Sequence, residues 1–131
     1  MKDEKFPEET MTTHEDRDLR DRTKQLALRI IRLYASLPKT TQAQVLGNQV
    51  LRSGTSVGAH YREACRGKSD ADFINKMEGG LQELDETAYW LELLVESNIV
   101  AEKKLQPLMK ETDELIAIFV TIVLNRKAKR K

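Results

Sequence analysis

Three groups of residues in this chain have the types and spacing to bind another molecule. The first is a basic run near the C-terminus: Arg126, Lys127, Lys129, Arg130 and Lys131. The second lies earlier and comprises Arg20, Arg22 and Lys24, with Arg17, Arg29 and Arg32 close by. Because Lys and Arg provide most of the affinity for phosphate backbones, both groups are candidate nucleic-acid-binding residues. No aromatic residue interrupts either run, so base stacking is not predicted and any binding should be weakly sequence-specific.

The third group combines an arginine with carboxylates and apolar residues. Glu83, Glu86, Trp90 and Leu94 recur at helical spacing on one arc, and the two glutamates are suitable ion partners for Arg52. Such a pair would fix the register of two helices if it is protected from water, or remain an ordinary solvated pair if it is not. Trp90 and Leu94 lie opposite the main apolar stripe of their helix and would be exposed in a monomer. We therefore predict a subunit interface here, with the N-terminal segment covering Trp90 as the alternative.

The residue patterns of common catalytic and metal sites are absent from the chain. Bundles that hold carboxylate-bridged metals use Glu-x-x-His, which does not occur, although His60-x-x-Glu63 places two ligand types at a suitable spacing. Neither a P-loop nor a G-x-G-x-x-G loop is present. The single cysteine, Cys65, has no evident base partner. We expect no catalytic residue, no metal and no cofactor, and hence a protein that is not an enzyme.

The elements that position these groups are predicted to be helices. The composition is rich in Leu, Glu, Lys, Arg and Ala and poor in aromatics, which favours an all-α fold. Apolar residues recur at helical intervals in four segments, at about 18–37, 41–67, 69–98 and 101–125. Short connections between them predict an antiparallel, up-down-up-down four-helix bundle.

The domain organisation follows from these segments. We predict a disordered acidic arm over residues 1–16, the bundle over 17–125 and a basic C-terminal tail over 126–131. Thr41 and Gln44 form a possible capping box for the second helix, and Ser69 is the predicted N-cap of the third. The second helix also carries a stripe of small residues, Gly47, Gly54, Gly58 and Cys65, which predicts the close approach of another helix inside the monomer or from a neighbouring subunit.

The net charge of +1 hides a strong asymmetry along the chain. Residues 39–68 carry five Lys or Arg and one Glu, whereas residues 69–98 carry eight acidic residues and one Lys. These segments could neutralise each other within the fold or bind separate partners. With no signal-peptide pattern, no long apolar run and no cysteine pair, we expect a cytoplasmic protein that is not embedded in a membrane.

Two sequence segments resemble a known family. These are R-S-G-T-S-V-G-A at 52–59 and E-T-A-Y-W-L-E-L-L at 86–94, and with the surrounding residues they make the chain similar to the 23S ribosomal RNA intervening-sequence family over about 20–125. The resemblance implies a four-helix bundle that assembles as a barrel-shaped homopentamer, some members being encoded inside 23S rRNA genes. A weaker likeness to the accessory variability determinant of diversity-generating retroelements implies a reverse transcriptase as a further candidate partner.

The function expected from these observations is that of a non-enzymatic, homo-oligomeric adaptor. Its candidate partners are RNA or DNA, or a ribonucleoprotein such as one containing a reverse transcriptase. The alternative is a purely structural or protein-binding oligomeric scaffold in which the basic helices are neutralised by the acidic third helix.

Overall fold

The computed structural model describes residues 13–130 of the chain. Four helices make up most of this range: α1 (Thr13–Ser36), α2 (Thr41–Cys65), α3 (Asp70–Glu96) and α4 (Glu102–Arg130). No strand occurs within residues 13–130, so the predicted all-α class with four helices is confirmed. None of the helices in this range is long and apolar enough to cross a membrane.

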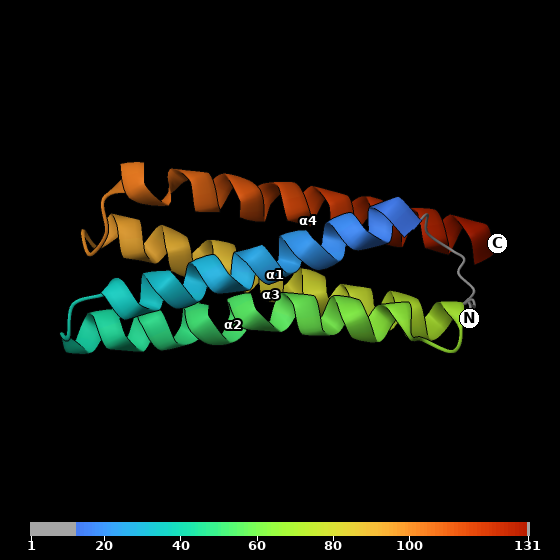
Figure 1. Ribbon diagram of the computed structural model, residues 1–131, viewed down its shortest axis with the longest axis horizontal. Helices are drawn as coiled ribbons and strands as arrows, with labels where there is room; N and C mark the ends of the chain where they lie inside the picture. The colour runs from blue at the N-terminus through green and yellow to red at the C-terminus, as the bar shows by residue number, and fades with distance from the viewer. Residues whose placement is uncertain (1–12, 131) are drawn as a thin grey trace.

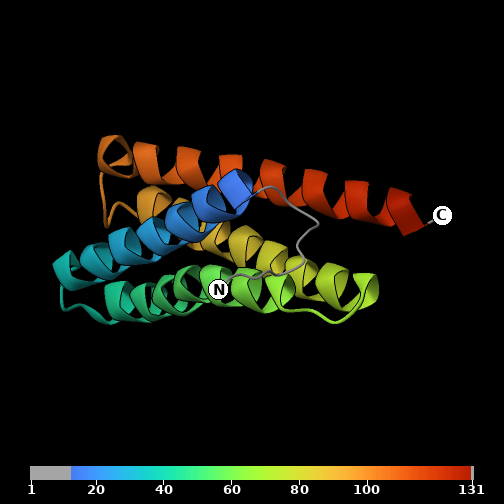
Figure 2. The same cartoon turned by 45° about the vertical axis from the view of Figure 1, so that its right-hand side comes forward.

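The helices pack along their lengths, and each runs in the opposite direction to the one before it (Figure 1). The pairs α1–α2, α2–α3 and α3–α4 lie side by side, whereas α1 crosses α4 at an angle and meets it over a short stretch only (Figure 2). The bundle is therefore closed on three sides and more open along the line between α1 and α4. This opening creates the two surface hollows described below.

The helix ends are set by local chemistry. The Ser69 hydroxyl accepts a hydrogen bond from the Asp72 amide, as predicted for the N-cap of α3. At the start of α2 the cap is Thr40, whose hydroxyl accepts a hydrogen bond from the Ala43 amide. The predicted capping box of Thr41 and Gln44 was therefore wrong, and the Gln44 side chain donates to the Pro38 carbonyl instead. α3 ends before Asn98, which has a φ of 64°, a left-handed conformation that asparagine tolerates at helix C-termini.

Two predicted domain boundaries differ from the structure because tertiary contacts extend both terminal helices. α1 begins at Thr13, so residues 13–16 belong to the bundle, where Asp16 accepts a hydrogen bond from Tyr61 of α2. The rest of the predicted acidic arm, residues 1–12, lies outside the described range. α4 continues to Arg130, so most of the predicted tail is helical, and Arg126 packs against the start of α3.

The core is formed by apolar side chains from all four helices. Fully buried side chains include Leu26 and Ile30 of α1, Val50, Val57 and Tyr61 of α2, Met77, Leu84 and Leu91 of α3, and Leu115 and Phe119 of α4. The glycine stripe of α2 faces α1: a Cβ added at Gly47 would lie 2.6 Å from Leu37 Cδ1, and one at Gly58 would lie 3.1 Å from Thr23 Oγ1. Close packing inside the monomer therefore accounts for the stripe.

Candidate nucleic-acid interface

The basic run at the end of α4 is partly built into the bundle. Only 7% of Arg126 is exposed; its Nη1 lies 3.2 Å from Asp70 Oδ1, and its guanidinium carbon lies 3.7 Å from the centroid of the Phe73 ring. Lys127 Nζ lies 2.9 Å from Glu78 Oε2. Lys129 is exposed, whereas the Arg130 side chain and Lys131 lie outside the described part of the chain. Arg126 therefore serves the packing of α4 on α3 and is not available as a phosphate ligand.

Two of the three predicted cations on α1 are also held in ion pairs. Arg20 donates through Nε to both carboxylate oxygens of Asp16, at 3.0 and 2.9 Å. Arg22 reaches across to α4, where its Nη2 lies 2.8 Å from Glu111 Oε1 and 3.0 Å from Glu114 Oε1. The contacts of Arg22 join α1 to α4, whereas the Arg20 pair lies within α1. Of the predicted group only Lys24 is exposed without an ion partner among the described residues.

Four of the cations that have no ion partner in the described part of the chain lie along the N-terminal half of α1 and the C-terminal end of α2. Asp16 of α1 accepts hydrogen bonds from Tyr61 and Cys65 of α2, so these three residues lie together. The residues that directly follow them in the sequence are Arg17, Arg62 and Arg66. Lys24 follows Thr23, which packs against Gly58 of α2. We call the following set the basic face; its members are all exposed and have no ion partner within residues 14–129: Arg17, Lys24, Arg62 and Arg66.

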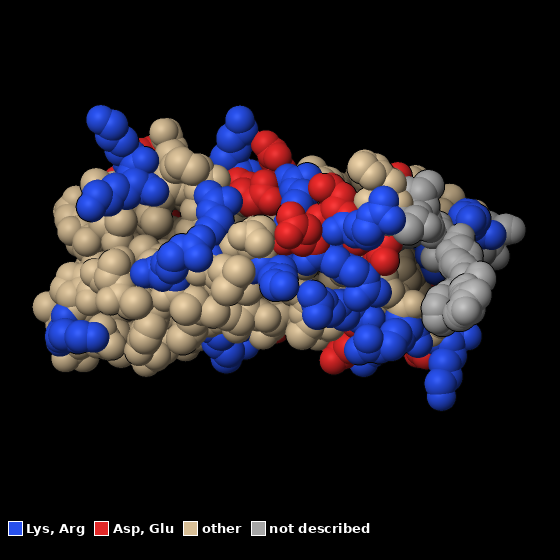
Figure 3. All heavy atoms as spheres, viewed as in Figure 1, with Lys and Arg blue, Asp and Glu red and all other residues tan. Residues whose placement is uncertain are grey.

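The surface view agrees with this grouping. Figure 3 shows Lys and Arg side chains over the N-terminal half of α1 and the C-terminal half of α2, with acidic side chains collected where α1 passes α4. Arg62 and Arg66 were absent from the predicted site, although the excess of Lys and Arg in residues 39–68 was the signal that could have found them. Their proximity to Arg17 depends on the antiparallel contact of two helices, which sequence spacing alone does not give.

The predicted pairing of Arg52 with the two glutamates of α3 is present. Arg52 Nη2 lies 3.0 Å from Glu86 Oε1, and its Nη1 lies 3.7 Å from Glu83 Oε1. The Arg52 side chain is 57% exposed, so the pair resembles a solvated surface pair more than a protected one. Glu83 is 17% exposed and also lies 3.8 Å from His60 Nε2. These contacts join α2 to α3 without forming a cavity or a metal site.

The two apolar residues of the predicted interface have different surroundings. Leu94 is fully buried in the monomer, which corrects the prediction that it lies at a subunit surface. Glu86, on the same arc, pairs with Arg52 of α2, so this arc faces α2. The bundle therefore buries Leu94, although helical periodicity places it opposite the main apolar stripe of α3. Trp90 is half-buried, and its ring centroid lies 5.1 Å from that of Tyr89, which is 52% exposed.

A partly buried polar cluster holds the start of α1 against the end of α2. Tyr61 Oη donates to Asp16 Oδ1 at 2.8 Å, and Cys65 Sγ donates to the same oxygen at 3.4 Å. Burial of Asp16 opposes its ionisation, but hydrogen bonds from Tyr61, Arg20 and Cys65 outweigh this effect and lower the pKa of the carboxyl. Burial raises the pKa of the Cys65 thiol, so the thiol is less nucleophilic than a free cysteine at neutral pH.

The other features of the described residues concern metal-binding groups and surface hollows. Residues 14–129 contain no group of three or more His, Cys, Asp or Glu side chains placed to hold a metal ion. Two hollows of about 500 Å³ each lie at opposite ends of the α1–α4 opening. One is lined by residues from the end of α1 and the start of α4, and the other by residues from the start of α1 and the end of α4.

The fold and surface together define an all-helical, four-helix protein with a basic face on its first two helices. The chain belongs to the 23S rRNA-intervening sequence protein family, which matches residues 15–121. It is also similar to a crystal structure described as a protein of unknown function from the S23 ribosomal protein family of Bacteroides thetaiotaomicron. The two are 37% identical with a TM-score of 0.77, and the alignment covers 82% of this chain and 96% of the other. Among curated proteins, none matches the chain.

Proposed function

We propose that this protein is a non-enzymatic, homo-oligomeric adaptor that binds nucleic acid, RNA in the first place, through the basic face of α1 and α2. The observation that supports it is the presence of four exposed, unpaired cations along the N-terminal half of α1 and the C-terminal end of α2. Such groups bind phosphates without having to break an existing ion pair. The C-terminal run contributes less, because Arg126 and Lys127 already have carboxylate partners.

The non-enzymatic part of the proposal rests on the character of the polar clusters. The Cys65 thiol has a raised pKa, and Asp16 is used to accept hydrogen bonds from neighbouring side chains. The Arg52, Glu83 and Glu86 group is an inter-helix ion pair on a largely exposed arginine. None of these arrangements pairs a nucleophile with a positioned base.

Assembly into a homo-oligomer is supported by apolar side chains on different faces of the monomer. Ile31 of α1, Tyr89 of α3 and Leu124 of α4 are 45%, 52% and 60% exposed. A closed ring needs two different patches that meet between neighbouring subunits, and apolar patches on separate helices meet that requirement. The family resemblance implies five subunits. Each ring would then present several copies of the basic face and bind a long phosphate chain with high avidity.

Light scattering at micromolar concentration tests the assembly. We expect a mass of five chains, and a reduced mass for Tyr89→Glu and Leu124→Glu, since each places a charge in an apolar contact. Trp90→Ala should weaken folding or assembly because the ring packs against the core. A single-chain mass for the unmodified protein would contradict the oligomer, and a dimer or tetramer would contradict only the number five.

RNA binding is tested by measuring affinity for a mixed-sequence RNA as salt is varied. Replacing the four cations of the basic face with glutamine should reduce the magnitude of the slope of log affinity against log salt by about 2 to 3, because each phosphate contact on a single strand contributes about 0.7. The matched control replaces Lys103 and Lys110, two exposed and unpaired lysines of α4, and should leave the slope unchanged.

The alternative function, a scaffold without nucleic-acid binding, is favoured by the ion pairs that neutralise Arg22, Arg126 and Lys127 within the bundle. No detectable RNA or DNA binding at low salt by a correctly assembled protein would support this alternative. For either function, the retroelement likeness suggests a protein partner: a reverse transcriptase or another protein component of a ribonucleoprotein. Co-purification of a candidate reverse transcriptase with and without nuclease treatment would distinguish protein contacts from RNA-bridged ones.

A further inference from the structure

The hollow between the end of α1 and the start of α4 has an unusual distribution of charge. Its polar lining includes three cations, Arg29, Arg32 and Lys104, and no carboxylate. None of the three has an ion partner among residues 14–129. The hollow at the other end of the α1–α4 opening has a similar volume, but it is lined by Glu15 and Asp18 as well as Arg126 and Lys129. Only the first therefore combines a cavity with uncompensated positive charge.

The apolar part of this hollow is made by side chains from three elements. Leu33 comes from α1 and Leu37 directly follows its last residue, Ile99 and Val100 come from the α3–α4 connection, and Leu108 comes from α4. Leu37 and Leu108 are 4% and 5% exposed, so the wall is continuous with the hydrophobic core. A ligand that enters here would bury apolar surface against fixed residues of the bundle.

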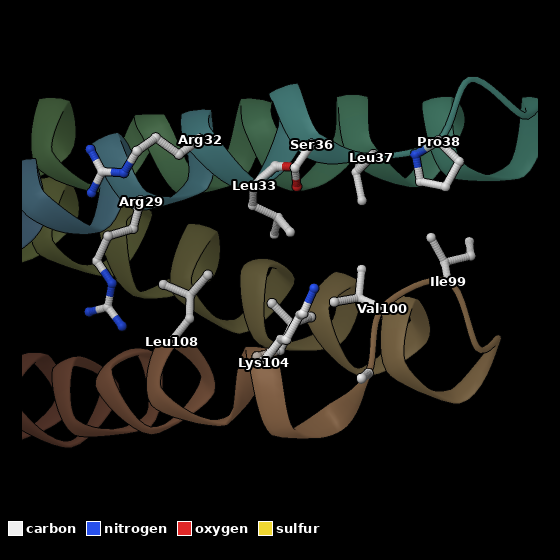
Figure 4. A pocket seen from close by; sticks show the side chains of 12 residues that line it. Arg29, Arg32, Leu33, Ser36, Leu37, Pro38, Ile99, Val100, Lys104 and Leu108 are labelled. Carbon is white, nitrogen blue, oxygen red and sulfur yellow. The ribbon is translucent and has the colours of Figure 1, made fainter.

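Charge and apolar surface are separated along the hollow. Figure 4 shows Arg29 and Arg32 at the end nearer the middle of the bundle, and Leu37, Pro38 and Ile99 at the opposite end. Lys104 extends from α4 toward α1 between these two ends (Figure 4). Arginine side chains present planar donor groups that match carboxylate and phosphate oxygens.

We propose that this hollow binds a small amphiphilic anion, in which a carboxylate or phosphate group is attached to an aliphatic body. The anionic group contacts Arg29 and Arg32, with Lys104 beside it, and the aliphatic body lies against Leu33, Val100 and Leu108. The volume of about 500 Å³ is in the range of small-molecule sites, which are usually about 300 to 1,000 Å³. This site is at the opposite end of α1 from the basic face and does not depend on RNA binding.

Calorimetric titration of the full-length chain with decanoate and with decyl phosphate, both below their micelle concentrations, tests the proposal. We expect saturable binding of at least one, and the tighter of the two identifies the head group. Decanol, which lacks the charge, and inorganic phosphate, which lacks the chain, should each bind at least about tenfold more weakly, because one anchoring interaction is lost. Binding of neither anion, or equal binding of decanol, would overturn the proposal.

Two variants place the binding in this hollow. Arg29→Gln with Arg32→Gln should weaken binding of the anion about tenfold or more and leave decanol binding unchanged. The matched control, Lys68→Gln with Lys110→Gln, removes two exposed cations that lie outside both this hollow and the basic face, and should leave anion affinity unchanged. Ala101→Phe should block both ligands by filling the hollow. Full affinity in the Arg29, Arg32 variant would refute the site.

Assembly could occupy the same hollow with a second copy of the chain. In that case the Arg29, Arg32 variant would lose subunits in light scattering, and the unmodified protein would bind neither decanoate nor decyl phosphate. This combination of results would assign the hollow to a subunit contact and overturn the small-molecule proposal.

Discussion

The guanidinium of Arg126 stacks on the ring of Phe73, with its central carbon 3.7 Å from the ring centroid. The same group pairs with Asp70 at 3.2 Å, so one side chain near the end of α4 contacts the first turn of α3 through both charge and ring. Arg126 belongs to a basic run that the sequence suggests is exposed, but this contact makes it part of the packing between α3 and α4.

Arg126→Gln should therefore lower the free energy of unfolding, by about 1 to 3 kcal/mol, because it removes a desolvated cation–π contact and an ion pair together. Urea denaturation monitored by circular dichroism measures the change. Lys129→Gln, an exposed neighbour on the same helix, should change it by no more than about 0.5 kcal/mol. Deletion of residues 126–131 should destabilise the bundle as Arg126→Gln does. A truncated chain as stable as the full-length, unmodified protein would contradict a structural role for Arg126.

A buried hydrogen bond joins the middle of α2 to the middle of α3. Ser53 Oγ and Thr87 Oγ1 are 2.8 Å apart, and the Thr87 hydroxyl also donates to the Glu83 carbonyl at 2.8 Å. Because Thr87 has one proton to donate, Ser53 is the donor in the pair. Thr87→Val should then cost about 1 to 3 kcal/mol of stability, since it leaves the Ser53 hydroxyl with only a long contact of 3.4 Å to the Val50 carbonyl.

Ser53→Ala should cost less than Thr87→Val, because the Thr87 hydroxyl keeps its carbonyl acceptor. The double variant should be more stable than the sum of the single changes predicts, since it leaves no unpaired donor behind. A double-mutant cycle in urea measures this coupling. Strict additivity would show that the Ser53–Thr87 bond contributes nothing specific.

The close contact of α1 with α2 depends on the absence of a side chain at Gly54. A Cβ at this position would overlap the Cδ1 atom of Ile30, which is fully buried. Gly54→Ala should thus destabilise the protein by about 1 to 3 kcal/mol through overpacking, although alanine favours a helix by about 1 kcal/mol over glycine. Ile30→Val removes the overlapping atom, so adding it to Gly54→Ala should recover part of the lost stability in thermal denaturation. A stabilised Gly54→Ala single variant would show that Ile30 repacks freely.

The lowered pKa of Asp16 predicts an acid-sensitive end of the bundle. Folding favours the ionised carboxylate, so this contribution to stability is complete above the ordinary carboxyl pKa of 3.8 and is lost as pH falls through the lower folded value. The free energy of unfolding should thus fall less steeply below pH 4 in Asp16→Asn than in the unmodified chain. Identical pH profiles for the two proteins would show that Asp16 does not stabilise the fold through its charge.

The helical class, the number of helices and most of the core follow from local patterns in the sequence. Apolar spacing in each segment is a local property, and residues such as Ile30, Val57 and Leu84 are buried because helical periodicity places them on one stripe. Ser69 could likewise be predicted as the N-cap of α3, because the capping hydrogen bond is local in the sequence. The pairing of Arg52 with Glu86 could also be predicted, because consecutive helices pack side by side and these two residues carry opposite charges.

Which charged side chains have no ion partner depends on how the helices pack. Arg22 and Arg126 have the same sequence character as Lys24 and Lys129, yet the first two find carboxylates on helices distant in the chain. The burial of Leu94 also depends on helix packing, because its arc of α3 faces α2. The hollow beside Arg29 exists because α1 diverges from α4 (Figure 2). Helical periodicity fixes the angle of a residue around its own axis, but the positions of the neighbouring axes decide what that angle faces.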